Sequence, residues 1–172
     1  MRSPKQMLVA CTLEVATTDE IRDFIESTSR NAEDHDSTMF EAFNPDPRVA
    51  RAKLGRFLRS HLPKFEISSE EGVGICRDEL LFQIDRLLRN KTTQSEFRDF
   101  FMPLESLLTI QHNIAVDFFG DLYNACDCFD AEWNFLPNDY LLEEAVRVRQ
   151  TISTEQKEGD ESEMATTRKP YD

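Results

Sequence analysis

No apolar run in this chain of 172 residues approaches the length of about 20 residues that a membrane-spanning helix needs. The first apolar run, from Met7 to Cys11, is short and is soon followed by Glu14. It therefore does not have the pattern of a secretory signal peptide. We expect a protein of the cytoplasm that makes no contact with a membrane.

Cysteine and histidine are too few and too dispersed for a familiar metal site. The cysteines are Cys11, Cys76, Cys126 and Cys128, and no second closely spaced pair completes a zinc pattern. The histidines lie far apart and lack the spacing of metal ligands. Free thiols in the core are the simpler interpretation of the cysteines. We expect neither a metal ion nor any other cofactor.

Signatures of catalysis are also missing. The segment Gly72–Gly74 lacks the third glycine and the preceding strand of a dinucleotide-binding loop. No nucleophile elbow, phosphate loop or catalytic cysteine motif occurs. The chain contains two pairs of carboxylates, Asp117 with Asp121 and Glu143 with Glu144, and hydrolytic enzymes use pairs of this kind. The Glu-x-x-His motif of a metal site in a helical bundle is absent, however. We therefore predict that the chain is not an enzyme.

Positive charge is absent from a long interval. The net charge is -13, and no lysine or arginine lies between Arg98 and Arg147. That interval contains the carboxylates of Asp99, Glu105, Asp117, Asp121, Asp127, Asp130, Glu132, Asp139, Glu143 and Glu144. A surface of one sign repels itself, but it attracts an oppositely charged partner. The net charge disfavours direct nucleic-acid binding, so we predict a basic protein partner.

Apolar residues at helical spacing occupy most of the chain. Thr17 with Glu20 and Thr93 with Glu96 predict capping boxes at two helix starts. Asp46-Pro47 predicts a third helix start. The helix that starts at Thr93 carries its apolar stripe from Phe97 to Leu108. Further helices are expected over 77–90, 113–126 and 139–152. The predicted fold is all-α, an antiparallel helical bundle of about four C-terminal helices with additional N-terminal helices packed against it.

Four places in the chain depart from this regular helical pattern. Met7–Val15 is apolar and β-branched, so a short strand or extended segment is predicted there. Glu70–Gly74 is predicted to be a loop, and Pro103 is expected to kink or split its helix. Thr154–Asp172 is almost free of apolar residues, which predicts a disordered acidic tail. We expect 1–153 to form a single domain.

The helix that begins after Asp46 has a basic stripe, which consists of Arg48, Arg51, Lys53, Arg56 and Arg59. A solvated face, or an internal partner for the acidic half of the chain, would explain it. A phosphate or nucleic-acid site is the other interpretation, but it fits poorly with the overall charge.

The acidic interval contains carboxylates at positions that do not favour a helix. In the predicted helix, Asp117 and Asp121 are one turn apart, and such like charges cost about 0.2–0.5 kcal/mol on an exposed face. Asp127 and Asp130 follow just past its expected end, where the helix dipole disfavours anions. A tolerated solvated face would explain any one of them. The whole run is more typical of a binding surface.

Aromatic residues are interleaved with these carboxylates. They are Tyr123, Phe129, Trp133 and Tyr140. Such residues anchor protein interfaces, although burial in the core would explain each of them singly. We take Tyr123 and Trp133 as the candidate anchors.

Several features of 79–152 match a known family. They are the helix from Glu79, the Thr93–Phe97 helix start, the Phe118–Tyr123 helix, the Cys126–Asp130 corner and the Tyr140–Glu144 segment of the last helix. In these features the stretch resembles the colicin D immunity-like family of small helical proteins. The resemblance covers somewhat under half of the chain. The first seventy-odd residues and the tail have no counterpart in that family.

The resemblance implies a function without catalysis. Members of the family bind the basic nuclease domain of a bacterial toxin that cleaves tRNA, and their acidic side chains lie where the substrate phosphates would lie. This chain would then be a monomer in a 1:1 complex with such a toxin. The residues implied as phosphate mimics are Asp117, Asp121, Asp127 and Asp130, with Tyr123 and Trp133 as anchors. The alternative is a non-enzymatic interaction or regulatory module unrelated to toxins.

Overall fold

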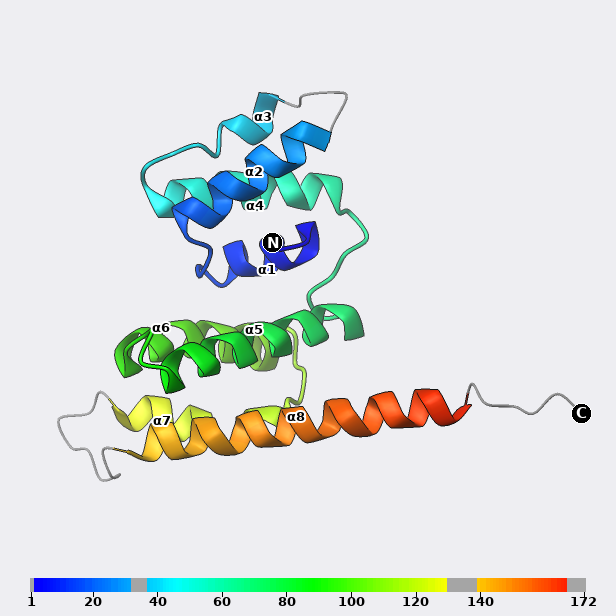
Figure 1. Ribbon diagram of the computed structural model, residues 1–172. Helices are drawn as coiled ribbons and strands as arrows, with labels where there is room; N and C mark the ends of the chain where they lie inside the picture. Colours follow the sequence, from blue (N-terminus) through cyan, green and yellow to red (C-terminus); the bar gives the residue numbers. More distant parts are fainter. Residues whose placement is uncertain (1, 32–36, 130–138, 167–172) are drawn as a thin grey trace, which may run out of the picture. The chain divides into compact units, whose positions relative to one another are not determined.

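The computed structural model describes residues 2–31, 37–129 and 139–166 (Figure 1). Every regular element in these ranges is a helix and none is a strand, which confirms the all-α prediction. No helix within the described ranges is long and apolar enough to cross a membrane. The chain divides into two compact units, the first formed by 1–79 with 106–114 and the second by 80–105 with 115–172.

The first unit contains α1 (Pro4–Thr12), α2 (Thr18–Asn31), α3 (Ser37–Phe40) and α4 (Pro47–His61). It also includes the first half of α5 (Glu70–Leu88) and the π-helical segment η1 (Ser106–Gln111). Helices α1 to α4 enclose a hydrophobic core of their own. Its buried members are Met7, Leu8, Ala10, Cys11, Ala16, Ile21, Phe24, Ile25, Met39, Ala42, Ala50, Leu54 and Leu58. This core lies within the first unit. The single domain predicted over 1–153 stays a prediction.

Helix α1 corrects the predicted strand at Met7–Val15. All five residues from Met7 to Cys11 are buried. A helix that is buried on every side has no polar face, so its sequence shows no helical period. A capping box at Ser3 and Gln6 begins the helix, and Pro4 occupies its first turn.

The second unit contains the rest of α5, together with α6 (Gln94–Glu105), the short 3-10 helix η2 (Asp117–Phe119), α7 (Leu122–Phe129) and α8 (Tyr140–Thr166). Helix α7 packs against both α6 and α8. The predicted stripe on α6 is buried, namely Phe97, Phe100, Phe101 and Leu104. The ring of Phe101 meets the ring of Phe119 edge-on at a centroid distance of 5.1 Å.

The three helix starts that were predicted from their caps are confirmed. In both capping boxes the threonine backbone N–H donates to the glutamate carboxylate, over 2.9 Å at Thr17–Glu20 and 2.8 Å at Thr93–Glu96. The hydrogen bond from the Thr93 backbone lowers the pKa of Glu96. Asp46 accepts from the N–H of Arg48 and caps α4. These contacts span two or three residues, which is why sequence spacing predicts them.

The predicted loop at Glu70–Gly74 is wrong, because α5 begins at Glu70. The Ser69 side chain accepts the N–H of Gly72 and serves as the helix cap. A β-carbon at Gly72 would lie 2.4 Å from the backbone oxygen of Ile67. This glycine therefore allows a close approach between backbone segments and does not form a turn.

Helix α6 continues through Pro103 to Glu105 and changes to the π-helical η1 at Ser106. The change comes three residues after the proline, where the sequence predicted a kink or a split. At the C-terminus, α8 extends to Thr166, whereas the predicted disordered tail begins at Thr154. Glutamate, lysine and glutamine are good helix formers, so a helix can continue where there is nothing apolar to bury.

Candidate functional site

Asp117 and Asp121 do not share a helix. The predicted helix over 113–126 is replaced by η2, by Gly120 with a φ of 54°, and by α7, which starts only at Leu122. Asp117 lies in η2 and is exposed, and Asp121 directly precedes α7. A carboxylate at this end of a helix is stabilised by the helix dipole. The predicted repulsion between these residues, one turn apart on one helix, is therefore wrong.

The carboxylate of Asp121 takes part in a local hydrogen-bond network. One oxygen accepts from the hydroxyl of Tyr140, at the start of α8, and the other accepts from the side-chain amide of Asn124. The hydrogen bond to Asp121 raises the pKa of the Tyr140 hydroxyl. The network fixes the position of Asp121 and joins the first turn of α7 to that of α8.

Glu144 supports the same corner from α8. Its side chain is buried, and it accepts the backbone N–H of Asp121 over 2.8 Å and a guanidinium N–H of Arg147 over 2.8 Å. Sequence reasoning counted Glu144 only as part of an acidic pair and missed this role. The signal that could have revealed it is Gly120, which interrupts an otherwise helical pattern.

Replacing Gly120 by alanine is expected to lower the free energy of unfolding of the second unit by about 1–3 kcal/mol. The backbone at Gly120 has a φ of 54° and a ψ of -135°, which side-chain-bearing residues rarely adopt. The new β-carbon would lie 2.6 Å from Oε1 of Glu144, the atom that accepts the Asp121 N–H. Chemical denaturation monitored by circular dichroism measures the loss.

The control for this substitution is Gly74→Ala in α5. No atom lies within 4 Å of the β-carbon that alanine would add at Gly74. Alanine in a helix interior is favoured over glycine by about 0.5–1 kcal/mol. The control should therefore keep or raise stability, and an equal loss in both variants would refute the proposed role of Gly120.

Two of the remaining candidate residues, Tyr123 and Asp127, lie on the outer face of α7. Leu122, Ala125 and Cys126 are buried, whereas Tyr123 and Asp127 are exposed one turn apart. Tyr123 is 45% exposed, a large value for an aromatic side chain. We define the acidic α7 surface as Asp117, Asp121, Tyr123 and Asp127. The two other predicted residues, Asp130 and Trp133, lie outside the described residues.

A cation also reaches this region. Nε of Arg98, on α6, donates to the backbone oxygen of Cys126 over 3.1 Å. The guanidinium thus lies against the C-terminal part of α7, where positive charge offsets the helix dipole. The sequence from Asp99 to Val146 contains no lysine or arginine, but in the structure Arg98 contacts this part of the chain.

Candidates for nucleophilic or metal chemistry are few. Cys11, Cys76 and Cys126 are buried free thiols, as predicted, and burial raises the pKa of each to about 12. Such thiols are poor nucleophiles at neutral pH. Among the described residues, no three His, Cys, Asp or Glu side chains are grouped as metal ligands.

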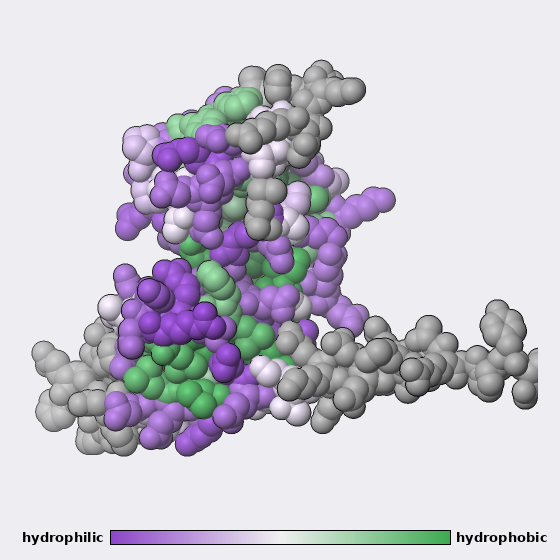
Figure 2. Space-filling model, viewed as in Figure 1, coloured by the Kyte–Doolittle hydropathy of each residue, from purple (hydrophilic) through white to green (hydrophobic). Residues whose placement is uncertain are grey.

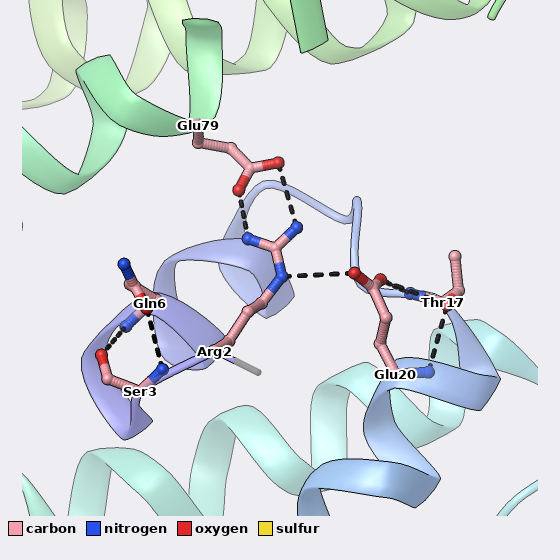
Figure 3. A network of polar contacts seen from close by, with 6 residues as sticks. All are labelled: Arg2, Ser3, Gln6, Thr17, Glu20 and Glu79. Carbon is pink, nitrogen blue, oxygen red and sulfur yellow. Dashed lines mark hydrogen bonds and ion pairs between the residues drawn. The ribbon is translucent and has the colours of Figure 1, made fainter. Parts of the chain in front are cut away.

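Two carboxylates of the first unit, Glu20 and Glu79, take part in a structural network (Figure 3). The Arg2 guanidinium donates to both oxygens of Glu79, which is buried on α5, and its Nε lies 3.4 Å from Glu20 on α2. Burial alone would lower the pKa of Arg2, but the hydrogen bonds and charges of Glu79 and Glu20 outweigh burial and raise it. The carboxylates are thus matched by a cation, so this network joins helices of the first unit.

Comparisons of the chain with protein-family models, with curated proteins and with solved structures found no match. The function is therefore inferred from the acidic α7 surface and from the residues that support it.

Proposed function

We propose that the chain is an immunity protein that neutralises a basic nuclease toxin through the acidic α7 surface. The observation that carries the proposal is the exposure of Tyr123 and Asp127 on one side of α7, with Asp117 exposed in the preceding turn. An aromatic ring among carboxylates offers an apolar anchor and acceptors for Lys and Arg. A basic, nucleic-acid-binding cleft has the complementary chemistry.

The division of the chain supports the proposal. The stretch that resembles the colicin D immunity-like family, 79–152, begins within one residue of the second unit, which starts at Leu80. The second unit contains this stretch except for residues 79 and 106–114, which belong to the first unit, so the resemblance concerns mainly one compact unit. In the proposal, α5 to α8 form the antiparallel helical bundle that presents the surface to the toxin.

The proposed inhibition requires binding alone. The carboxylates of Asp117 and Asp127 would accept charge-assisted hydrogen bonds from the toxin residues that otherwise hold the RNA phosphates. Asp121, fixed by Tyr140 and Asn124, is a preorganised acceptor beside them. One monomer in the cytoplasm would block one toxin domain, without a cofactor and without touching the nucleic acid itself.

The variant Asp117→Asn/Asp127→Asn is expected to lose affinity for the toxin while remaining folded. Both residues are exposed, so replacing their carboxylates by amides should cost little stability. Close charge pairs in complementary interfaces contribute roughly 1.5–7 kcal/mol each. Calorimetric titration with a basic nuclease toxin domain, sought among the products of adjoining genes, measures the effect at several salt concentrations. Asp121 is left unchanged because its hydrogen bonds support the fold.

The control is Asp23→Asn/Glu66→Gln, which removes two exposed carboxylates from the first unit. The parent and the control should bind alike and should weaken together as salt rises. The Asp117/Asp127 variant should bind less tightly and depend less on salt. If all three proteins bind with one affinity and one salt slope, the acidic α7 surface is only a solvated face.

A second candidate function rests on the first unit. Residues 1–79 have a core of their own and no counterpart in the immunity-like stretch. An interaction or regulatory module would use both units. Co-expression with any nuclease toxin found in an adjoining gene separates the two functions: survival of the cells supports immunity, whereas binding of a basic protein without rescue favours the module.

A further inference from the structure

Helix α4 concentrates positive charge in an acidic chain. From Pro47 to His61 it contains Arg48, Arg51, Lys53, Arg56 and Arg59 and no carboxylate, although the net charge of the chain is -13. Its buried side consists of Ala50, Leu54 and Leu58. Like charges in a row on one helix repel one another. The contacts of each cation therefore need an explanation.

Two of these cations stabilise the first unit. Arg51 donates to the backbone oxygen of Glu14, just beyond the end of α1, and Arg59 donates to the hydroxyl of Thr12 over 3.5 Å. Positive charge at the C-terminus of a helix offsets its dipole. These two residues therefore have an internal role, but their partner is α1 and not the acidic half of the chain that the sequence suggested.

Two of the other cations, Lys53 and Arg56, are exposed on a different side of α4. Lys53 and Arg56 follow the exposed Val49 at spacings of four and seven residues, so the three side chains share one side of the helix. Arg48 is exposed at the start of the same helix. Nζ of Lys53 lies 3.8 Å from the carboxylate of Glu41, which brings this side of α4 beside the segment that follows α3.

That segment carries an exposed aromatic pair. The rings of Phe40 and Phe43 are stacked with centroids 5.8 Å apart, and the side chains are 39% and 43% exposed. Met39 and Ala42 are buried in the core and hold the segment in place. Figure 2 shows hydrophobic colour over α3 at the top of the view. Such clustered apolar exposure is typical of interaction sites.

A small hollow adjoins Phe43. Its volume is about 270 Å³, and Ile21, Ala42, Phe43 and Pro45 are among its lining residues. Small-molecule sites usually measure about 300–1,000 Å³, so the hollow suits a single apolar side chain. Partners commonly insert one anchor side chain into a pocket of this kind.

We propose that the α3–α4 surface, formed by Phe40, Phe43, Val49, Arg48, Lys53 and Arg56, binds an acidic protein segment that carries apolar side chains. Carboxylates of the segment pair with the cations of α4, and an apolar side chain enters the hollow and covers the phenylalanine rings. A nucleic acid fits less well, because it carries a charge on every nucleotide and the net charge of the chain repels it.

This surface goes beyond the proposed function. It belongs to the first unit, and its charge is opposite to that of the acidic α7 surface. Its partner is acidic, whereas the toxin is basic. The two proposals can therefore fail separately, and the experiment on the α3–α4 surface needs no toxin.

Peptide display tests the proposal on the full chain. A library of random peptides about 16 residues long is selected on the parent protein, with counter-selection on Phe40→Ser/Phe43→Ser/Arg48→Gln/Arg56→Gln. Enriched peptides should be acidic with apolar residues at helical or alternating spacing. A synthetic copy of one should bind the variant about tenfold more weakly or worse, and its binding to the parent should weaken with salt.

A matched variant, Phe82→Ser/Ile110→Ser/Lys64→Gln/Arg89→Gln, removes the same kinds of exposed side chain elsewhere. It should bind the peptide like the parent. If the first variant loses its circular dichroism spectrum, Arg48→Gln/Arg56→Gln alone decides the charge dependence. Absence of acidic enrichment, or equal binding by variant and parent, overturns the proposal. Tighter binding of single-stranded DNA than of the peptide at this surface overturns it in favour of a nucleic-acid site.

Discussion

Replacing Phe101 by alanine is expected to lower the free energy of unfolding of the second unit by about 3–5 kcal/mol. The side chain is fully buried, and its ring packs against Phe97 at 6.2 Å and Phe119 at 5.1 Å between centroids. Alanine would leave a cavity among rings from α6 and η2 that cannot easily collapse. This loss is a large share of the about 5–15 kcal/mol that stabilises a typical domain. Urea denaturation followed by circular dichroism measures it.

Phe82→Ala is the control for Phe101→Ala. The Phe82 ring is 49% exposed, and the Arg86 guanidinium lies 5.9 Å from its centroid. Losing an exposed cation–π contact costs about 0.5–1 kcal/mol. A loss at Phe101 as small as that at Phe82 would contradict the packing described here.

Arg2→Gln is expected to destabilise the first unit by about 3–5 kcal/mol, the usual result when one member of a buried ion pair is removed. The Glu79 side chain is only 4% exposed, and Arg2 donates to both of its oxygens. Glutamine cannot replace the charge or the paired donors of the guanidinium. The measurement is the midpoint of urea unfolding for the full chain.

Two further variants test this explanation. In Arg2→Gln/Glu79→Gln the buried charge is gone, so the double variant should be more stable than Arg2→Gln alone. Lys5→Gln breaks an exposed ion pair, in which the side chains of Lys5 and Glu71 are 38% and 57% exposed. This substitution should cost no more than about 1 kcal/mol of stability. If Arg2→Gln costs no more than Lys5→Gln, the network in Figure 3 contributes little to stability.

The candidate site was only partly predictable from the sequence. Buried and exposed residues alternate along α7 at helical spacing, so the exposure of Tyr123 and Asp127 follows from a local pattern. The role of Asp121 was not predictable, because its partners, Tyr140 and Glu144, are 19 and 23 residues away. Spacing along one helix cannot reveal a hydrogen bond between two helices.

The sequence by itself determined the features that depend on neighbours three or four residues apart. These are the all-α fold, the caps at Thr17, Asp46 and Thr93, and the buried stripe from Phe97 to Leu104. Each is a local interaction, so residue type and spacing suffice to predict it.

Only the tertiary structure decided the features that depend on distant contacts. Helix α1 is stabilised by burial on all sides, which removes the amphipathic period from its sequence. A β-carbon at position 120 would lie too close to the carboxylate of Glu144, which belongs to another helix, so a glycine interrupts the helical pattern there. Arg2 and Glu79 are 77 residues apart, and a charge pair at that separation forms only when the chain folds. The energy of such contacts depends on burial, which the sequence does not specify.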